Sequence, residues 1–94
     1  MAYVFAFHGT RNALARFFFP QGPAILEDPA TGSATANFGG WCLAMQMDLP
    51  VQLQISQGEL AGRPSTLHLH VDAERSIFVG GDVIELGRGS VNLP

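Results

Sequence analysis

The sequence predicts a single α+β domain in which one apolar helix packs against a sheet of antiparallel strands. Two patterns lead to this prediction. Short runs of β-branched and aromatic residues alternate with turn residues, which is typical of strands, whereas residues 31–47 contain no charge and have helical spacing. Ninety-four residues are enough for one hydrophobic core, and they are far fewer than a two-domain enzyme requires.

Two strands are expected before the helix. Residues 3–7 (YVFAF) and 13–19 (ALARFFF) are rich in aromatic and aliphatic side chains, and residues 8–12 between them form a turn. A second turn follows at residues 21–23. Three adjacent phenylalanines at 17–19 place aromatic bulk on both faces of the second strand, so we expect it to lie between the core and a partner.

The helix is expected over residues 31–47. Asp28 precedes Pro29, and a residue before proline is disfavoured in helical geometry, so the helix begins after it. One helical face carries Ala34, Phe38, Trp41 and Met45. The other faces are also small or apolar, which is typical of a buried helix. Gly39 and Gly40 each cost about 1 kcal/mol relative to alanine, which predicts close backbone packing at both.

Four strands are expected after the helix. Their ranges are residues 51–56, 66–71, 76–79 and 83–86. Apolar and polar residues alternate in the first two, and a turn at residues 80–82 separates the last two. The short links favour antiparallel neighbours. Residues 89–94 are expected to form a loose tail.

The composition narrows the classes of function. Charged residues make up only 14% of the chain, against about 25% in ordinary soluble domains, so we expect a partner to cover one face. A net charge of −3 gives no basic surface for nucleic acid. No apolar run approaches the ~20 residues that span a bilayer, and no signal peptide is recognisable, which predicts a cytoplasmic protein with no membrane partner.

Neither a metal site nor a cofactor is predicted. The single cysteine, Cys42, has apolar neighbours and is expected to be a buried, inert thiol. His68 and His70 share one face of a strand, but a metal needs a third ligand, for which Asp72 is the nearest candidate. The favoured interpretation is two polar residues on the solvent side. The glycine pair at residues 80–81 is interpreted as a tight turn, since no helix follows it.

Residues 27–34 (EDPATGSA) combine a turn, a helix start and several polar groups. Thr31 or Ser33 can cap the first turn, and Gly32 lets another group approach the backbone. The first amides of a helix have no internal partner and carry about half a positive charge. With the carboxylate of Asp28 beside them, they predict a pocket for a small anion. The alternative is an ordinary capped helix.

The order of these residues resembles a known family. EDPATGSA is the hallmark of the phenazine-biosynthesis (PhzF-like) isomerase/epimerase family, which is similar in fold to diaminopimelate epimerase. The resemblance extends to RFFFP at 16–20, QG at 57–58, GRPS at 62–65, VGG at 79–81 and GRG at 87–89. It covers nearly the whole sequence but only about the last third of the family. It implies a single lobe over residues 1–94, in which an antiparallel curved sheet (a half barrel) wraps around one central buried helix.

The resemblance also implies a chemistry. Family members move a proton at carbon without a cofactor, using paired acid–base groups from two similar lobes. By position, Asp28 would be the acid–base or relay group of this lobe, and Thr31, Gly32 and Ser33 would donate hydrogen bonds to the substrate. The principal catalytic glutamate of the family belongs to an amino-terminal lobe that this sequence does not contain. Neither Glu27 nor Glu59 lies in the corresponding motif.

Three functional hypotheses follow. A stand-alone lobe could pair with itself, because a symmetric homodimer would restore a two-lobed body and complete an isomerase or epimerase site. A binding module could keep the anion pocket for a small carboxylate without turnover. An inactive remnant would do neither. A dimeric binding or vestigial domain is favoured over an active isomerase.

Overall fold

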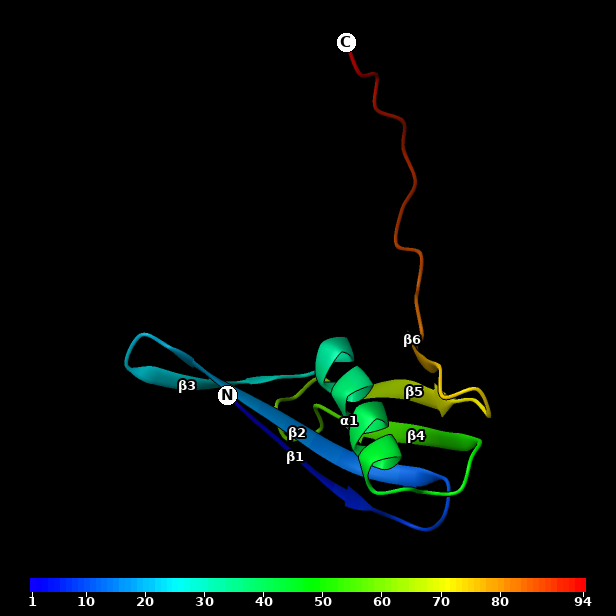
Figure 1. Cartoon of the computed structure of the whole chain (residues 1–94). Coiled ribbons are helices and arrows are strands. Elements are labelled where there is room, and N and C mark those ends of the chain that lie inside the picture. Colours follow the sequence, from blue (N-terminus) through cyan, green and yellow to red (C-terminus); the bar gives the residue numbers. More distant parts are fainter.

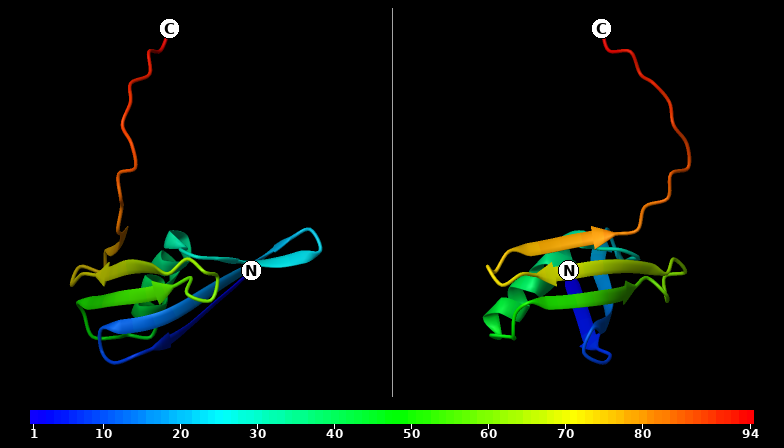
Figure 2. Two further views of the ribbon diagram at one scale, coloured as in Figure 1. Left: turned by 180° about the vertical axis from the view of Figure 1, so that it is seen from behind. Right: turned by 90° about the vertical axis from the view of Figure 1, so that its right-hand side faces the viewer.

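The computed structural model describes residues 1–94, which form six strands and one helix (Figure 1). The elements are β1 (Ala2–Phe7), β2 (Asn12–Gln21), β3 (Ala24–Asp28), α1 (Gly32–Ala44), β4 (Val51–Gln57), β5 (Ser65–Val71) and β6 (Ile77–Gly81). The strands form one open sheet in the order β1-β2-β4-β5-β6, and β3 pairs with β2 off this path. Helix α1 lies across one face of the sheet (Figure 2). The α+β class predicted from the sequence is therefore confirmed.

The sheet is mixed, so the prediction of a wholly antiparallel sheet is wrong at one position. β2 and β4 run parallel, with Asn12 opposite Gln54 and Ala15 opposite Gln57. The other four pairings are antiparallel. A short link forces two consecutive strands to run antiparallel, but it does not set the direction of strands farther apart in the sequence. β3 and α1 lie between β2 and β4, and they bring the chain back beside β2 running in the same direction as β2.

The end of β3 meets the end of β4 beside β2. Phe17 of β2 pairs with both β1 and β3, so these two strands lie on opposite sides of β2. Ala15 pairs with both β1 and β4, so β4 lies on the same side as β3. Asp28 and Gln57, the last residues of β3 and β4, therefore lie next to each other. Because only three residues separate the end of β3 from the start of α1, the first turn of the helix lies at the same junction.

The core lies between α1 and the sheet. The buried apolar side chains are Ala13, Ala15, Phe38, Cys42, Val51, Leu53, Ile55, Leu67, Leu69 and Val71. Phe38 stacks on Phe5 of β1 with ring centroids 3.9 Å apart. A Cβ added at Gly39 would lie 2.8 Å from Cγ2 of Ile77, so this glycine permits the close approach of α1 to β6. An added Cβ at Gly40 would meet nothing, so the expected close packing holds for Gly39 alone.

Helix α1 is buried on one face only, which corrects the prediction of a helix buried on all sides. Thr35, Phe38 and Cys42 face the sheet and are at most 1% exposed. Trp41 and Met45, toward the end of the helix, remain 37% and 57% exposed, although the Trp41 ring packs against Phe5 of β1 with ring centroids 5.1 Å apart. The sheet is open and covers a single side of the helix, so an apolar helix surface remains uncovered.

The helix ends at Ala44, three residues before the expected end at Met47. Gln46 adopts a left-handed conformation with φ 56°. Its N–H donates to the Leu43 carbonyl at 3.0 Å, and the Met47 N–H donates to the Cys42 carbonyl at 3.1 Å. These two bonds form a Schellman motif, which terminates the helix without a glycine.

Two expectations about strands are wrong. Only two strands were expected before the helix, but residues 24–28 form a third, β3. Residues 83–86 were expected to form a strand, but β6 ends at Gly81 and the following residues extend away from the sheet without partners (Figure 1). The glycines at 80 and 81 lie in β6 rather than in a turn. No helix of the structure has the length and apolar character needed to cross a membrane.

Candidate functional site

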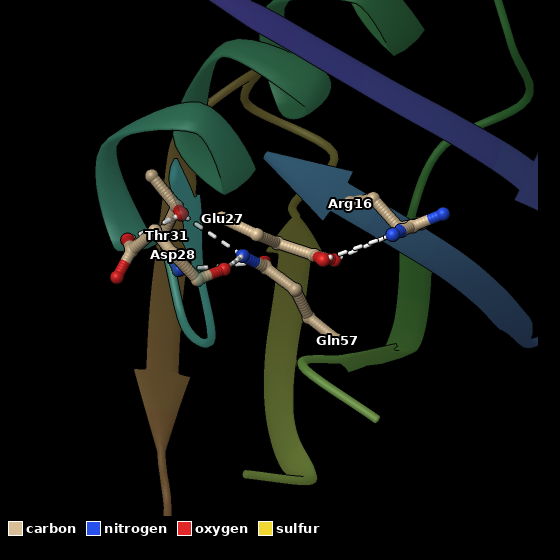
Figure 3. Close-up of polar contacts among 5 residues, drawn as sticks. All are labelled: Arg16, Glu27, Asp28, Thr31 and Gln57. Carbon is tan, nitrogen blue, oxygen red and sulfur yellow. Dashed lines mark hydrogen bonds and ion pairs between the residues drawn. The ribbon is translucent and has the colours of Figure 1, made fainter. Parts of the chain in front are cut away.

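The candidate site lies where β3, β4 and α1 meet (Figure 3). Gln57 is at its centre and is only 1% exposed. Its Nε2 donates to the Asp28 carbonyl at 2.8 Å and to Thr31 Oγ1 at 2.9 Å. Its Oε1 accepts from the Thr31 N–H at 3.3 Å. One buried amide therefore joins the end of β4 to the end of β3 and to the start of α1.

Thr31 is bonded to Asp28 instead of capping the helix. It occupies the N-cap position with extended backbone (φ −118°, ψ 92°), but its side chain makes no cap hydrogen bond. The hydroxyl donates instead to Asp28 Oδ2 at 2.6 Å, and Asp28 Oδ1 accepts no hydrogen bond. The sequence offered Thr31 and Ser33 as possible caps of the first turn, and neither side chain caps it. Asp28 thus keeps one carboxylate oxygen free.

The first amides of α1 are consequently without partners. The N–H groups of Gly32, Ser33 and Ala34 make no hydrogen bond, and the first bonded amide is that of Thr35, at 3.1 Å from the Thr31 carbonyl. Gly32 and Ser33 are exposed, and the Ser33 hydroxyl is also free. Donors of this kind at a helix amino terminus favour negatively charged ligands.

A groove of about 610 Å³ adjoins this helix end. Its lining comes from the helix start, from the Pro64–Ser65 part of the GRPS element and from β6; the residues are Ala30, Gly32, Pro64, Ser65, Thr66, Leu67, Val79, Gly80, Gly81, Asp82 and Ile84. An added Cβ at Gly32 or Gly80 would meet no atom within 4 Å. The fold thus brings three of the motifs together. Asp28, Thr31 and Ser33 do not line the groove.

Glu27 is held on the side of β3 away from Asp28 (Figure 3). It forms a two-pronged ion pair with Arg16, in which Nε and Nη2 each lie 2.9 Å from a carboxylate oxygen. Hydrogen bonding to Arg16 lowers the pKa of Glu27, and the same bonds raise the pKa of Arg16. The guanidinium also lies 4.8 Å from the ring centre of Phe18. Glu27 ties β2 to β3 and is not free to act as a second acid–base group.

Gly58 fixes the other side of the junction. It has φ 87°, and a Cβ there would lie 2.6 Å from the Pro29 carbonyl oxygen and would also collide with the Arg63 carbonyl. Both residues of the QG element therefore have a structural role at the junction, and sequence reasoning found neither. The role of Gln57 could not be read from its neighbours. Its partners are 26 and 29 residues distant in the sequence, so no local pattern reveals them. The only available signal was its place in the family resemblance.

The histidines lie on the opposite face of the sheet. His68 and His70 line a shallow groove of about 430 Å³ together with polar residues of β2 and β4. Asp72, the proposed third ligand, instead accepts a hydrogen bond from the Ser76 N–H at 2.8 Å. No group of three metal-ligating side chains is assembled. Cys42 is completely buried, as predicted, and burial raises the pKa of its thiol.

The comparisons with known proteins agree with the motif. The model of a family described as phenazine biosynthesis-like protein matches residues 2–86. A protein named as an uncharacterized isomerase from Pasteurella multocida is 45% identical over 83 residues, which are 88% of this chain and 28% of that relative. An uncharacterized isomerase from Mesorhizobium japonicum is 37% identical over 84 residues, or 81% of this chain and 27% of the relative. The chain thus spans little more than a quarter of either relative. No solved structure gives a significant match.

Proposed function

The chain belongs to the family of phenazine biosynthesis-like proteins, and from this premise we propose that it is one lobe of a diaminopimelate-epimerase-like fold that binds a small carboxylate. The binding site is the amino end of α1. A single observation supports this proposal above all: three consecutive helix amides have no partner, while the side chain placed to cap them is bonded elsewhere.

In this proposal the roles of the four motif residues differ. Gly32 and Ser33 donate their N–H groups, and the Ser33 hydroxyl, to the carboxylate. Thr31 positions Asp28 through the 2.6 Å hydrogen bond. The free Oδ1 of Asp28 is the atom that would exchange a proton with a bound molecule. The site needs no cofactor for this chemistry, since a carboxylate can itself accept and return a proton.

We further propose that two copies associate through the exposed apolar surface at the end of α1. The exposed helix surface includes Trp41 and Met45, and apolar surface of this kind is rarely left in water. A symmetric dimer would bring a second helix and a second Asp28 into one body.

Sedimentation velocity at micromolar concentration tests the dimer, which should sediment at about twice the 10.1 kDa chain mass. Met45→Glu should dissociate it, because a charge would be buried in an apolar interface. Leu60→Glu, at a loop position that is 76% exposed, is the matched control and should leave the dimer intact. A wild-type chain that sediments only as monomer would contradict this part of the proposal.

A second candidate function is a cofactor-independent isomerase or epimerase whose site is completed by the second chain. Two observations favour it: the relatives are named isomerases, and Asp28 has a carboxylate oxygen that accepts no hydrogen bond. Glu27 cannot supply the other acid–base group, because Arg16 holds it. The partner would have to supply that group.

Proton exchange at carbon separates the two functions. Wild type is incubated in D₂O with a panel of small α-substituted carboxylic acids, and deuterium incorporation is followed by NMR. For an isomerase, Asp28→Asn should slow the exchange by about 10²- to 10⁴-fold, because it removes the acid–base group. Glu27→Gln alters the neighbouring carboxylate and should retain the exchange. Binding without exchange supports a binding lobe, and the absence of both contradicts both functions.

A further inference from the structure

Gln57 is the buried residue that determines where the Thr31 hydroxyl points. We propose that it is a positioning residue: by bonding to Thr31 it keeps the hydroxyl on Asp28, and it thereby keeps the helix amides open for a carboxylate. This inference rests on the proposed function, in which those amides bind the ligand.

The orientation of the Gln57 amide is fixed by its partners. The Thr31 N–H can only donate, so the atom facing it at 3.3 Å must be the amide oxygen. The Asp28 carbonyl can only accept, so the atom facing it at 2.8 Å must be the amide nitrogen. Nε2 of Gln57 carries two hydrogens. One is donated to the Asp28 carbonyl, so the other is directed at Thr31 Oγ1, 2.9 Å away.

The direction of the Thr31 proton follows from this orientation. Because Nε2 of Gln57 can only donate, Thr31 Oγ1 must accept from it. The hydroxyl proton is then left for Asp28 Oδ2 at 2.6 Å. Both contacts hold the oxygen away from the first turn of α1, and Thr31 is 7% exposed, so water does not compete for it.

Without Gln57 the same threonine could cap its own helix. Its backbone already has the extended N-cap conformation, in which a threonine oxygen normally accepts from the second or third helical amide. Here those amides belong to Ser33 and Ala34. A hydroxyl turned onto the Ser33 amide would occupy a donor that the ligand needs. Gln57 therefore acts on ligand binding through Thr31, without contacting the ligand.

Four forms of the chain test this inference: wild type, Gln57→Met, Thr31→Val and the double variant. Sodium succinate is titrated into each, and the amide resonances of Gly32 and Ser33 are followed by ¹H–¹⁵N NMR. We expect Gln57→Met to weaken binding about tenfold, as for one hydrogen bond to a charged group. Thr31→Val loses the bond to Asp28 but has no hydroxyl to compete for the amides, so it should bind succinate more tightly than Gln57→Met. The double variant should regain that affinity, which a merely structural role of Gln57 would not produce.

A readout that needs no ligand separates this inference from the proposed function. Three-bond couplings report the Thr31 side-chain torsion, which should change in Gln57→Met. An unchanged torsion, or a double variant that stays as weak as Gln57→Met, would overturn the inference. A changed torsion in a chain whose wild type does not bind succinate would contradict the proposed function alone. If Gln57→Met does not fold, a tenfold loss of affinity in Thr31→Val still overturns the inference.

Discussion

Replacing Gly58 with alanine is expected to destabilise the domain by about 4 kcal/mol or more, the largest effect of any single substitution considered. A left-handed conformation alone costs a non-glycine residue about 1–3 kcal/mol. Here the added methyl would also collide with the Arg63 carbonyl and lie 2.6 Å from the Pro29 carbonyl oxygen, so the backbone of the site would have to move. Urea unfolding followed by Trp41 fluorescence measures the loss.

Gly62→Ala is the matched control for this prediction. Gly62 also has a left-handed conformation, with φ 77°, but an added Cβ would meet no atom within 4 Å. Gly62→Ala should therefore lower the free energy of unfolding only by the conformational strain, about 1–3 kcal/mol. Equal losses in the two variants would show that the contact of Gly58 with the motif backbone has no energetic importance.

Gly32→Pro is expected to reduce carboxylate affinity by about 10- to 100-fold while leaving the fold intact. Proline is favoured at the first helical position, and the extended conformation of Thr31 suits a residue before proline. The substitution removes an N–H that makes no hydrogen bond within the protein. Stability should thus stay within about 1 kcal/mol of wild type. A bond to a charged ligand would be lost, at about 1.5–3 kcal/mol.

Gly32→Ala distinguishes the lost donor from added bulk. It keeps the N–H, and its Cβ would meet no protein atom within 4 Å. Succinate affinity measured for both variants should fall much further with proline than with alanine. A proline variant that binds as tightly as wild type would show that the Gly32 amide does not contact the ligand.

Local patterns predicted most of the fold. The alternation in residues 51–56 and 66–71 and the helical spacing after Thr31 lie in the elements observed as β4, β5 and α1. The predictions that failed concern segments whose pairing depends on strands distant in the sequence. Residues 83–86 have strand-like composition but pass beyond the start of β5, so no neighbour pairs with them. The parallel pairing of β2 with β4 likewise follows from tertiary packing, which no short link specifies.

The start of the helix was predicted correctly, but the hydrogen bonds around it were not. The EDPATGSA motif correctly located the start of α1 beside Asp28. Propensity favoured Thr31 or Ser33 as a helix cap, because these side chains commonly accept from the first amides. The tertiary bond from Gln57 overrides that local preference. Burial of the whole helix was also inferred from its composition, although composition cannot tell which side of a helix a given sheet covers.

A ¹H–¹⁵N NMR titration of wild type with sodium succinate most directly tests the central claim that the amino end of α1 binds a small carboxylate. We predict saturable shifts that are largest at the Gly32 and Ser33 amides, where the unpartnered donors lie. The claim would be contradicted if those two resonances did not move, or if the saturable shifts lay instead around His68 and His70 on the far face of the sheet.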